Sequence, residues 1–484
     1  MLNPVKKLPA IACILGLAAA VRILAILAWF LLSGDPAAFH YPDTATYLAP
    51  AQSLIEHGTL ERNGSPEIIR GPGYPLLLTL GLAAGHVEAV TVALQILLSV
   101  ATVYLLYRCA LELTDGRAQV ALLAAAFYAL EPLSVVYSCL LLTETLFAFL
   151  IASFLLALIH FLKHNSPRSL LLAAVFLTAS AFVRPVSYYL PLVVAGVLLV
   201  AAPRDRRFWR PVGLATGFLL ACALPLGAWQ VRNWQLTGYP GFSAIVESNL
   251  YFYQQASVTA SLEGRSLEKV QAEMGMFDPQ GPLKQHPEWK GLSEGEMHVR
   301  MGAEAKHLIR QHPLTYAKNH VRNIFRLLVT PGSGDVMQLT GNSGGKVQAS
   351  GGQATASGGL EHVAAGGRGR IVTALVLSGI AVTYLLLAVF GCFQRMTARV
   401  RWTLITIATY FWFISCLPQS PARLRHPLML FVCLLAAQGA SALIAHVRAR
   451  TSRRELGRPL TSPVSQPSFR LRPRRALDAA VPPA

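Results

Sequence analysis

Charged residues are scarce in this sequence. Of its 484 residues, 14% are charged and 53% are hydrophobic, a balance too apolar for a soluble domain of this length. The shortage excludes an ordinary soluble enzyme. Long apolar runs recur along most of the chain instead, and about 20 such residues are enough for a helix to cross a bilayer. The sequence therefore predicts a membrane protein.

Cysteine is also sparse, and the seven cysteines form no CxxC pair. All lie in or beside apolar runs, which favours a packing role over disulfide bonds or metal ligation. They are Cys13, Cys109, Cys139, Cys222, Cys392, Cys416 and Cys433.

Acidic residues are outnumbered, with 24 Asp and Glu against 42 Lys and Arg and a formal net charge of +18. Arginine-rich loops and a basic tail account for this excess, because such segments contact anionic lipid and fix the topology of a membrane protein. We therefore expect membrane lipid, and no nucleic acid, among the partners of the chain.

The apolar runs predict an all-α polytopic membrane protein, a bundle of about ten transmembrane helices with an outward-facing loop domain. The predicted spans are 8–32, 87–110, 118–133, 139–162, 168–184, 187–202, 211–231, 371–393, 402–418 and 425–446.

The short basic loops all fall on one side of this topology, which is typical of the cytoplasmic side. We expect a multi-pass protein of the cell inner (plasma) membrane whose other side faces the periplasm or the exterior. The predicted regions are an N-terminal transmembrane module 1–232 with a first outer loop 33–86, an outer loop region 233–370 that is flexible from 332, C-terminal transmembrane helices 371–446, and a disordered basic cytoplasmic tail 447–484.

Polar residues near the apolar phase are costly, so their positions indicate function. Most of them fall on the predicted outer side. Asp43 begins an amphipathic segment, Arg70 precedes a Gly-Pro-Gly-Tyr-Pro turn, and Glu144 lies just inside a span. The others are Arg184, Arg232, Asn233, Arg423, Arg425 and His426.

In their order, these motifs resemble the polyprenyl-phosphate-dependent GT-C glycosyltransferases, in particular family 39, with its bacterial protein-mannosyltransferase and aminoarabinose-transferase relatives. The resemblance rests on an Asp with a Tyr four residues later, PGYPL, TETLF, an Arg-Pro pair, WQVRN, HPLTYAKNHV and RLRHPLMLF. It implies a GT-C module in 1–232 and transfer of a sugar, with inversion, from a polyprenyl-phosphate donor to a glycan, lipid or protein acceptor on the outer face.

Such a displacement needs a base for the acceptor proton and cations for the departing phosphate. Asp43 is the candidate base, although it could instead be a helix N-cap that accepts a hydrogen bond from Thr46. Glu144 matches the second acid of the family, with a structural pair to Arg184 or Arg232 as the alternative. The candidate substrate-binding residues are Tyr47, Arg70, Tyr74, Arg184, Arg232, Asn233, Arg423, Arg425 and His426, of which Tyr47 is expected mainly to pack.

We predict no metal ligands and no cofactor. Ile69 stands where the aminoarabinose branch carries a glutamate that can bind a metal, and a divalent metal is possible but unsupported. A transporter or flippase of an anionic lipid or solute is the rival interpretation. It would carry polar residues at mid-membrane in both halves, whereas those in this sequence gather near the outer face, which favours the enzyme.

Overall fold

The structure, a computed structural model, describes residues 7–33, 39–201, 209–276, 278, 280–338, 367–418 and 422–456. Within these ranges the regular structure is helical apart from one antiparallel hairpin, β1 (Glu61–Arg62) and β2 (Ser65–Pro66). The chain is thus an all-α polytopic membrane protein, as the sequence predicted.

Among the described residues, six helices are long and apolar enough to cross a membrane, or seven spans result if the bent pair α5 (Ala118–Ala129) and α6 (Pro132–Cys139) counts as one. The six are α1 (Lys7–Ser33), α4 (Val87–Leu113), α7 (Glu144–His164), α10 (Arg210–Thr237), α19 (Gly367–Cys392) and α21 (His426–Leu456). Each of the ten predicted spans overlaps a helix, but several of these helices are shorter than a full crossing. Those are α8 (Pro167–Val183), α9 (Leu190–Ala201) and α20 (Ala398–Ile414), whereas the short helix α3 (Gly73–Ala83) lies outside the predicted spans.

Helix α7 lies at the centre of the bundle, packed between α4 and α8. Its central part, residues 146–159, is apolar nearly all round, the pattern of a buried helix, and Phe147, Ile151 and Phe154 on it are fully buried. Lipid offers no hydrophobic gain for helix association, so close packing must supply the stability. Gly391 and Gly439 do this between α19 and α21, because a Cβ on either would lie about 2 Å from a backbone oxygen of the other helix.

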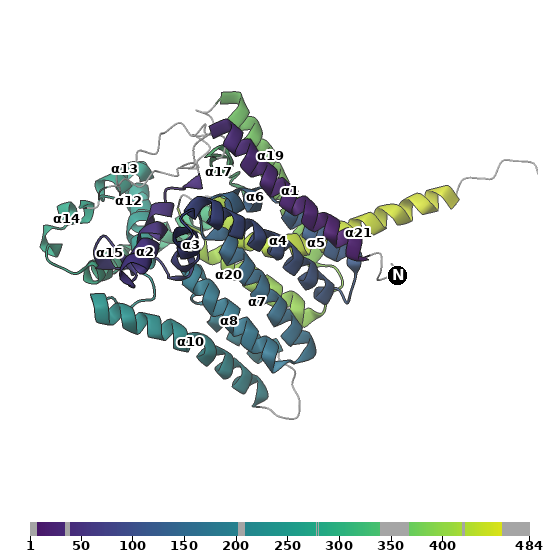
Figure 1. The fold of residues 1–484 in the computed structure, drawn as a ribbon, viewed down its shortest axis with the longest axis horizontal. Helices are drawn as coiled ribbons and strands as arrows, with labels where there is room; N and C mark the ends of the chain where they lie inside the picture. The colour runs from purple at the N-terminus through teal and green to yellow at the C-terminus, as the bar shows by residue number, and fades with distance from the viewer. Residues whose placement is uncertain are drawn as a thin grey trace, which may run out of the picture. The chain divides into compact units, whose positions relative to one another are not determined.

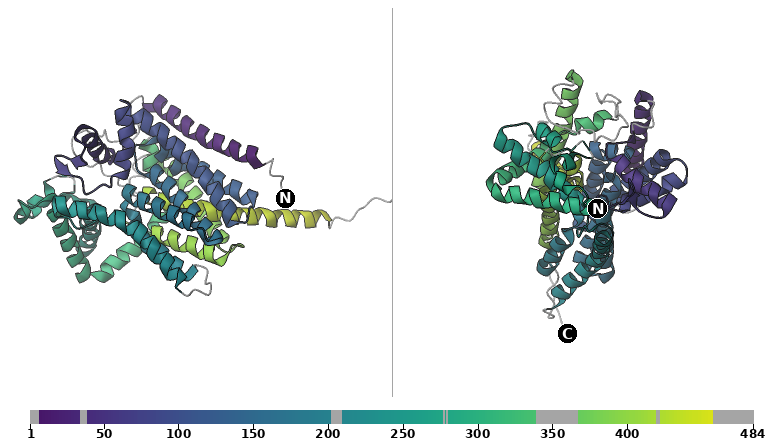
Figure 2. Two further views of the ribbon diagram at one scale, coloured as in Figure 1. Left: turned by 60° about the horizontal axis from the view of Figure 1, so that its bottom comes forward. Right: turned by 90° about the vertical axis from the view of Figure 1, so that its left-hand side faces the viewer.

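Shorter helices cluster at one end of the long ones (Figure 1; Figure 2, left). They are α2 (Thr44–His57), α11 (Ile245–Asn249), the π-helix η4 (Leu250–Gln255), α12 (Ala256–Glu263), α13 (Leu267–Glu273), α14 (Gly281–Gln285), α15 (Glu294–Gln311), α16 (Pro313–Val329) and α17 (Ser333–Gln338), with the 3-10 turns η3 (Pro185–Ser187), η5 (Pro287–Trp289) and η6 (Ala422–Arg425).

The prediction of a flexible segment from residue 332 needs correction. Residues 333–338 form helix α17, and Ser333 and Asp335 are buried. Tertiary contacts order this stretch although its own composition favours flexibility. Residues 339–366, and the predicted tail from 457, lie outside the described residues. The described residues up to 442 belong to one compact unit and those from 443 onward to a second; the site described below lies in the first.

Candidate active site

The loop before α2 holds Asp43 in place through its threonine neighbour. The buried Thr44 hydroxyl accepts a hydrogen bond from the Tyr41 backbone N–H at 2.8 Å and donates one to the Leu141 carbonyl at 2.9 Å. These bonds tie the first outer loop to the segment that leads into α7. Asp43 is therefore fixed in position immediately ahead of the helix.

Asp43 does not cap α2 through its side chain among the described residues, which removes the capping alternative. Its two carboxylate oxygens accept hydrogen bonds from two guanidinium groups instead, from Arg70 at 3.1 Å and from Arg423 at 2.7 Å. These partners lie 27 and 380 residues away in the sequence. The tertiary fold, and not local helix chemistry, decides what this carboxylate does.

The Gly-Pro-Gly-Tyr-Pro turn brings Arg70 to the site. A Cβ on Gly71 would lie 2.1 Å from the Phe182 carbonyl oxygen, and one on Gly73 would lie 2.7 Å from a Val183 methyl. Glycine is thus required for the turn to close against the end of α8. The buried Glu67 carboxylate also accepts the Arg70 backbone N–H at 2.8 Å, which fixes the turn from its other side.

Glu144 begins α7 with its side chain fully buried. Its carboxylate forms ion pairs with Arg184 at 2.7 Å, where the chain leaves α8, and with Arg423 at 2.9 Å, in η6. A buried carboxylate persists only when its charge is compensated in this way. The pair with Arg184 is the structural alternative that the sequence left open, and it coexists with a place in the site.

Five charged residues from distant parts of the sequence thus make one continuous chain of ion pairs. Its order is Arg70, Asp43, Arg423, Glu144 and Arg184. Three arginines meet two carboxylates in this chain, which leaves one positive charge in excess. We call it the arginine–carboxylate chain. Its composition suits an anionic ligand such as a phosphate.

Each arginine of the chain also lies against an aromatic ring. The guanidinium carbon is 4.7 Å from the ring centre of Tyr47 for Arg70, 5.7 Å from that of Phe147 for Arg184, and 5.0 Å from that of Tyr41 for Arg423. Such contacts favour the charged group and restrict its orientation. The ring contacts therefore restrict the orientation of all three arginines.

Asp43 is the most exposed member of the chain, with 29% of its side chain accessible, whereas Glu144 has none. Burial raises the pKa of Asp43, but the positive charges of Arg70 and Arg423 lower it by more than burial raises it. The pKa of Asp43 therefore lies below the usual value. Asp43 is consequently ionised at neutral pH and partly accessible. Glu144 is fully buried and paired with two arginines.

Asp335 is a functional candidate that the sequence analysis missed. Its carboxylate accepts hydrogen bonds from the hydroxyls of Tyr41 at 3.2 Å and Tyr137 at 2.9 Å, and burial raises its pKa above the usual value. The Arg423 guanidinium lies over the Tyr41 ring. By accepting the Tyr41 hydroxyl, Asp335 fixes this ring and so supports Arg423 in the arginine–carboxylate chain. The sequence signal, an acid in a Gly/Ser-rich stretch, is too weak to find such a residue.

Tyr47 and Tyr74 pack together, with their rings edge to face and 5.3 Å between centres. The buried Tyr74 hydroxyl donates a hydrogen bond to Gln95 at 2.8 Å, and Gln95 donates to the Leu140 carbonyl. Tyr74 therefore supports the site from within the core. The Tyr47 ring lies between Tyr74 and the Arg70 guanidinium.

Arg232 and Asn233 do not join the arginine–carboxylate chain in the described structure. Arg232 donates to the backbone carbonyls of Glu67 at 2.7 Å and Leu60 at 3.2 Å, and so ties the end of α10 to the first outer loop. The Asn233 amide donates to the carbonyls of Gly241 and Phe242. Both residues hold loops in place, among them the loop that carries Arg70.

Arg425 and His426 follow Arg423 closely in sequence but face elsewhere. The buried Arg425 guanidinium donates to the carbonyls of Leu327, Leu328 and Thr330, which closes the C-terminal end of α16. His426 lies 3.1 Å from the Ser134 hydroxyl. Neither contacts the arginine–carboxylate chain through a hydrogen bond among the described residues.

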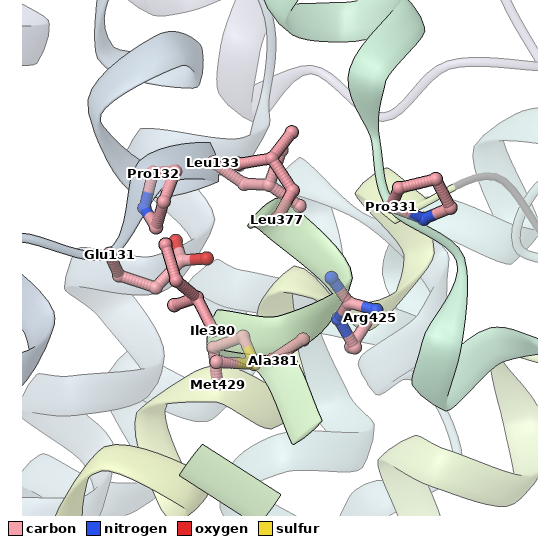
Figure 3. A pocket seen from close by; sticks show the side chains of 9 residues that line it. All are labelled: Glu131, Pro132, Leu133, Pro331, Leu377, Ile380, Ala381, Arg425 and Met429. Carbon is pink, nitrogen blue, oxygen red and sulfur yellow. The ribbon is translucent and has the colours of Figure 1, made fainter. Parts of the chain in front are cut away.

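A small hollow lies beside Arg425 (Figure 3). The Glu131 carboxylate and the Arg425 guanidinium stand on either side of it, but Glu131 caps α6 by accepting from the Ser134 backbone and hydroxyl. Since both polar groups are engaged in helix caps, the hollow offers a substrate little to bind. Its lining residues are Glu131, Pro132, Leu133, Pro331, Leu377, Ile380, Ala381, Arg425 and Met429.

Comparison with known proteins identifies a related family for part of the chain. Residues 69–229 match the dolichyl-phosphate-mannose-protein mannosyltransferases. This range is about a third of the chain and contains Arg70, Glu144 and Arg184. It confirms the resemblance drawn from the motifs and supports a membrane glycosyltransferase over a transporter. No curated protein sequence matches the chain.

Two solved structures are similar in part. One is the archaeal oligosaccharyltransferase AglB from Archaeoglobus fulgidus in complex with an inhibitory peptide and a dolichol-phosphate. It is 13% identical to this chain with a TM-score of 0.47, and the match covers 93% of this chain and 52% of that one. The apo form of the Archaeoglobus fulgidus oligosaccharyltransferase is 12% identical with a TM-score of 0.49, over 94% and 52% of the two chains. The chain thus spans about half the length of these proteins.

Proposed function

We propose that the chain transfers a sugar, with inversion, from a polyprenyl-phosphate donor to an acceptor at the outer face of the membrane. The observation that carries this proposal is the arginine–carboxylate chain, which joins two carboxylates and three arginines beside aromatic rings. Three of its five residues lie within the range that matches the mannosyltransferase family.

In this proposal the arginines bind the donor phosphate and stabilise it as it departs. A guanidinium group can form two parallel hydrogen bonds to a phosphate, and such charge-assisted bonds are stronger than neutral ones. Fixed cations aimed at the developing charge also need no rearrangement during the reaction. Arg70 and Arg423, which already hold Asp43 from two sides, are the best placed for this task.

Asp43 is the proposed base. Inversion requires the acceptor to attack the anomeric carbon from the side opposite the departing phosphate, while a carboxylate takes the acceptor proton. The Asp43 side chain is ionised and partly exposed. Glu144, fully buried between Arg184 and Arg423, keeps those arginines oriented.

Donor and base are coupled through the shared arginines. In the free protein Arg70 and Arg423 pair with Asp43, which makes that carboxylate a weak base. A bound phosphate competes for the same guanidinium groups and loosens their hold on Asp43. Donor binding therefore raises the basicity of Asp43 just when an acceptor proton has to be removed.

The acceptor is proposed to approach from the helices of the outer region. The π-helix η4 carries Tyr253, whose hydroxyl interacts electrostatically with Asp43 and Arg423, and π-helical turns are frequent at functional sites. Helix α16 ends on the Arg425 cap, two residues from Arg423. A glycan, a lipid or a protein hydroxyl are the candidate acceptors.

The test uses purified protein in lipid vesicles, supplied with polyprenyl-phosphate sugars of different kinds and a mixture of membrane acceptors. We expect released polyprenyl phosphate together with a glycosylated acceptor. Arg70→Ala should weaken use of the donor by about 1.5–3 kcal/mol, since it removes a charge-assisted hydrogen bond. Arg265→Ala is the matched control, because Arg265 pairs with Glu263 and Glu273 in the outer region, away from the site.

Two results would contradict the proposal. Movement of the intact donor across the vesicle without release of polyprenyl phosphate would indicate a transporter. Equal donor dependence in Arg70→Ala and in the unaltered protein would remove Arg70 from the phosphate site.

We also propose that this site faces the periplasm or exterior of the inner membrane, because the basic loops of the chain share the other side. A cysteine introduced at Arg300 in α15 should react with a membrane-impermeant thiol reagent in intact cells, whereas one at Asp115 should react only after the membrane is opened. The reverse pattern would invert the orientation.

A further inference from the structure

Two histidines lie one turn apart at the end of α7, on the same face of the helix. His160 and His164 are four residues apart, and their ring centres are 4.3 Å from each other. Both side chains are partly open to their surroundings, at 43% and 50% exposure. Positions i and i+4 are neighbours on a helix, so both rings can reach one ligand.

Glu112, near the end of α4, faces both histidines at once. One carboxylate oxygen lies 3.6 Å from His160 Nδ1, and the other lies 3.3 Å from His164 Nε2. The three potential ligand atoms all lie within 4.8 Å of one another. Because α4 packs directly on α7, the backbones keep these side chains together.

Lys163, the neighbouring cation, is directed away from the Glu112 carboxylate. Its ammonium group donates to the backbone carbonyl of Glu112 and, at 2.6 Å, to the carboxylate of Asp115. The Lys163 charge is thus matched by Asp115, and the Glu112 carboxylate stays directed at the two imidazoles.

We propose that Glu112, His160 and His164 bind a divalent transition-metal ion, with Zn²⁺ the best fit. Imidazole nitrogen and carboxylate oxygen are ordinary zinc ligands at about 2.0–2.2 Å, and a tetrahedral ion with such bonds holds its ligand atoms roughly 3.3–3.5 Å apart. Each imidazole nitrogen lies about this far from one Glu112 oxygen, Oε1 for His160 and Oε2 for His164. With one ligand atom from each residue the three atoms lie within 4.8 Å of one another, so binding one ion needs a side-chain rotation that brings them closer. Water would complete the coordination of a site with three protein ligands.

This metal site is separate from the arginine–carboxylate chain and independent of the proposed transfer reaction. Glu144 begins α7 and His164 ends it. At 1.5 Å per residue, His160 and His164 lie about 24–30 Å along the helix from Glu144. The ion would join the far ends of α4 and α7, the helices that carry Gln95 and Glu144 at the other end.

The experiment uses the full-length protein in detergent, stripped of metal with a chelator and titrated with Zn²⁺ by calorimetry and with Co²⁺ by absorption spectroscopy. We expect one equivalent to bind and the Co²⁺ spectrum to show a tetrahedral site. His160→Ala, His164→Ala and Glu112→Gln should each weaken Zn²⁺ binding by at least about ten-fold. Mutation of a residue that only hydrogen-bonds to a metal ligand already lowers metal affinity by about that factor, and loss of a ligand itself should lower it at least as much. His446→Ala, which removes an exposed helical histidine elsewhere, is the control and should change nothing.

A second measurement needs no variant. Zn²⁺ should protect His160 and His164, but not His446, from modification by diethyl pyrocarbonate, as followed by peptide mass spectrometry. The proposal is overturned if the His160→Ala/His164→Ala double variant binds Zn²⁺ as tightly as the unaltered protein, or if Zn²⁺ leaves the reactivity of His160 and His164 unchanged.

Discussion

At the scale of single residues, Asp43 shows how neighbours set the chemistry of a carboxylate. One oxygen accepts a hydrogen bond from Arg70, and the other accepts one from Arg423 in the 3-10 turn η6, ahead of the last long helix. Partial exposure keeps the carboxylate accessible, while the arginines keep it ionised. The same contacts that bind phosphate in our proposal therefore also restrain the proposed base.

Asp43→Asn should lower the rate of sugar transfer by roughly two to four orders of magnitude, because the amide cannot take the acceptor proton. Donor binding should persist, since Arg70 and Arg423 remain. Transfer and donor binding are measured separately, with size-exclusion chromatography to check folding. Asp115→Asn, which alters an exposed acid at the other end of the bundle, is the control. A near-normal rate in Asp43→Asn would assign the base to another group.

The pH dependence of the rate should report the coupling between donor and base. A base works only when ionised, so activity falls as the pH drops through the pKa of Asp43, which lies below its usual value in the free protein. A bound phosphate draws Arg70 and Arg423 away and raises that pKa. The acidic limb of kcat should thus lie at higher pH than the acidic limb of kcat/KM for the donor. Coincident limbs would show that the arginines stay on Asp43.

At the scale of elements, the turn at 71–75 joins two parts of the site. It closes on the end of α8, where the backbone of Phe182 leaves no room for a side chain at residue 71. Arg70 on the turn and Arg184 at the end of α8 are thereby held on one side of the bundle. The Gly-Pro-Gly-Tyr-Pro motif was visible in the sequence, but its partner surface was not.

Gly71→Ala should both destabilise the protein and slow transfer. The added methyl would lie 2.1 Å from the Phe182 carbonyl oxygen, and a backbone shift to relieve such a clash costs about 1–3 kcal/mol. A displacement of about 1 Å at Arg70 can lower the rate on the order of 100-fold. Thermal unfolding and transfer assays measure the two effects.

Gly217→Ala is the matched control, because a Cβ at Gly217 in α10 meets no described atom within 4 Å. Alanine in a helix interior should stabilise by about 0.5–1 kcal/mol. If both variants behave alike, the close approach at Gly71 is not what positions Arg70.

At the scale of the whole molecule, the sequence predicted much of the architecture. All ten apolar runs coincide with helices, because a segment that crosses a bilayer must be continuously apolar and must pair every backbone group within itself. A continuous apolar run can be recognised from neighbouring residues alone, without knowledge of the fold. The prediction was least accurate where short helices pack inside the bundle. In the part of the chain that the structure describes, six helices are long enough to cross a membrane alone, or seven spans with the bent pair.

The sequence by itself also singled out the five charged residues that pair in the arginine–carboxylate chain, since each stood out as a polar group beside an apolar run. Their cost in a membrane makes such residues conspicuous one at a time. The sequence could not separate these five residues from Arg232, Arg425 and His426, which also lie beside apolar runs. In the structure those three contact backbone carbonyls or a serine hydroxyl instead.

Tertiary structure alone decided which charges meet. The ion pairs of the arginine–carboxylate chain join residues from 27 to 380 positions apart, and Asp335 reaches Tyr41 across 294 residues. Local periodicity reports the face on which a side chain lies, not the distant segment packed against that face. Helix propensity and hydropathy act over a few residues, whereas the pairing of buried charges is settled by the packing of the whole bundle.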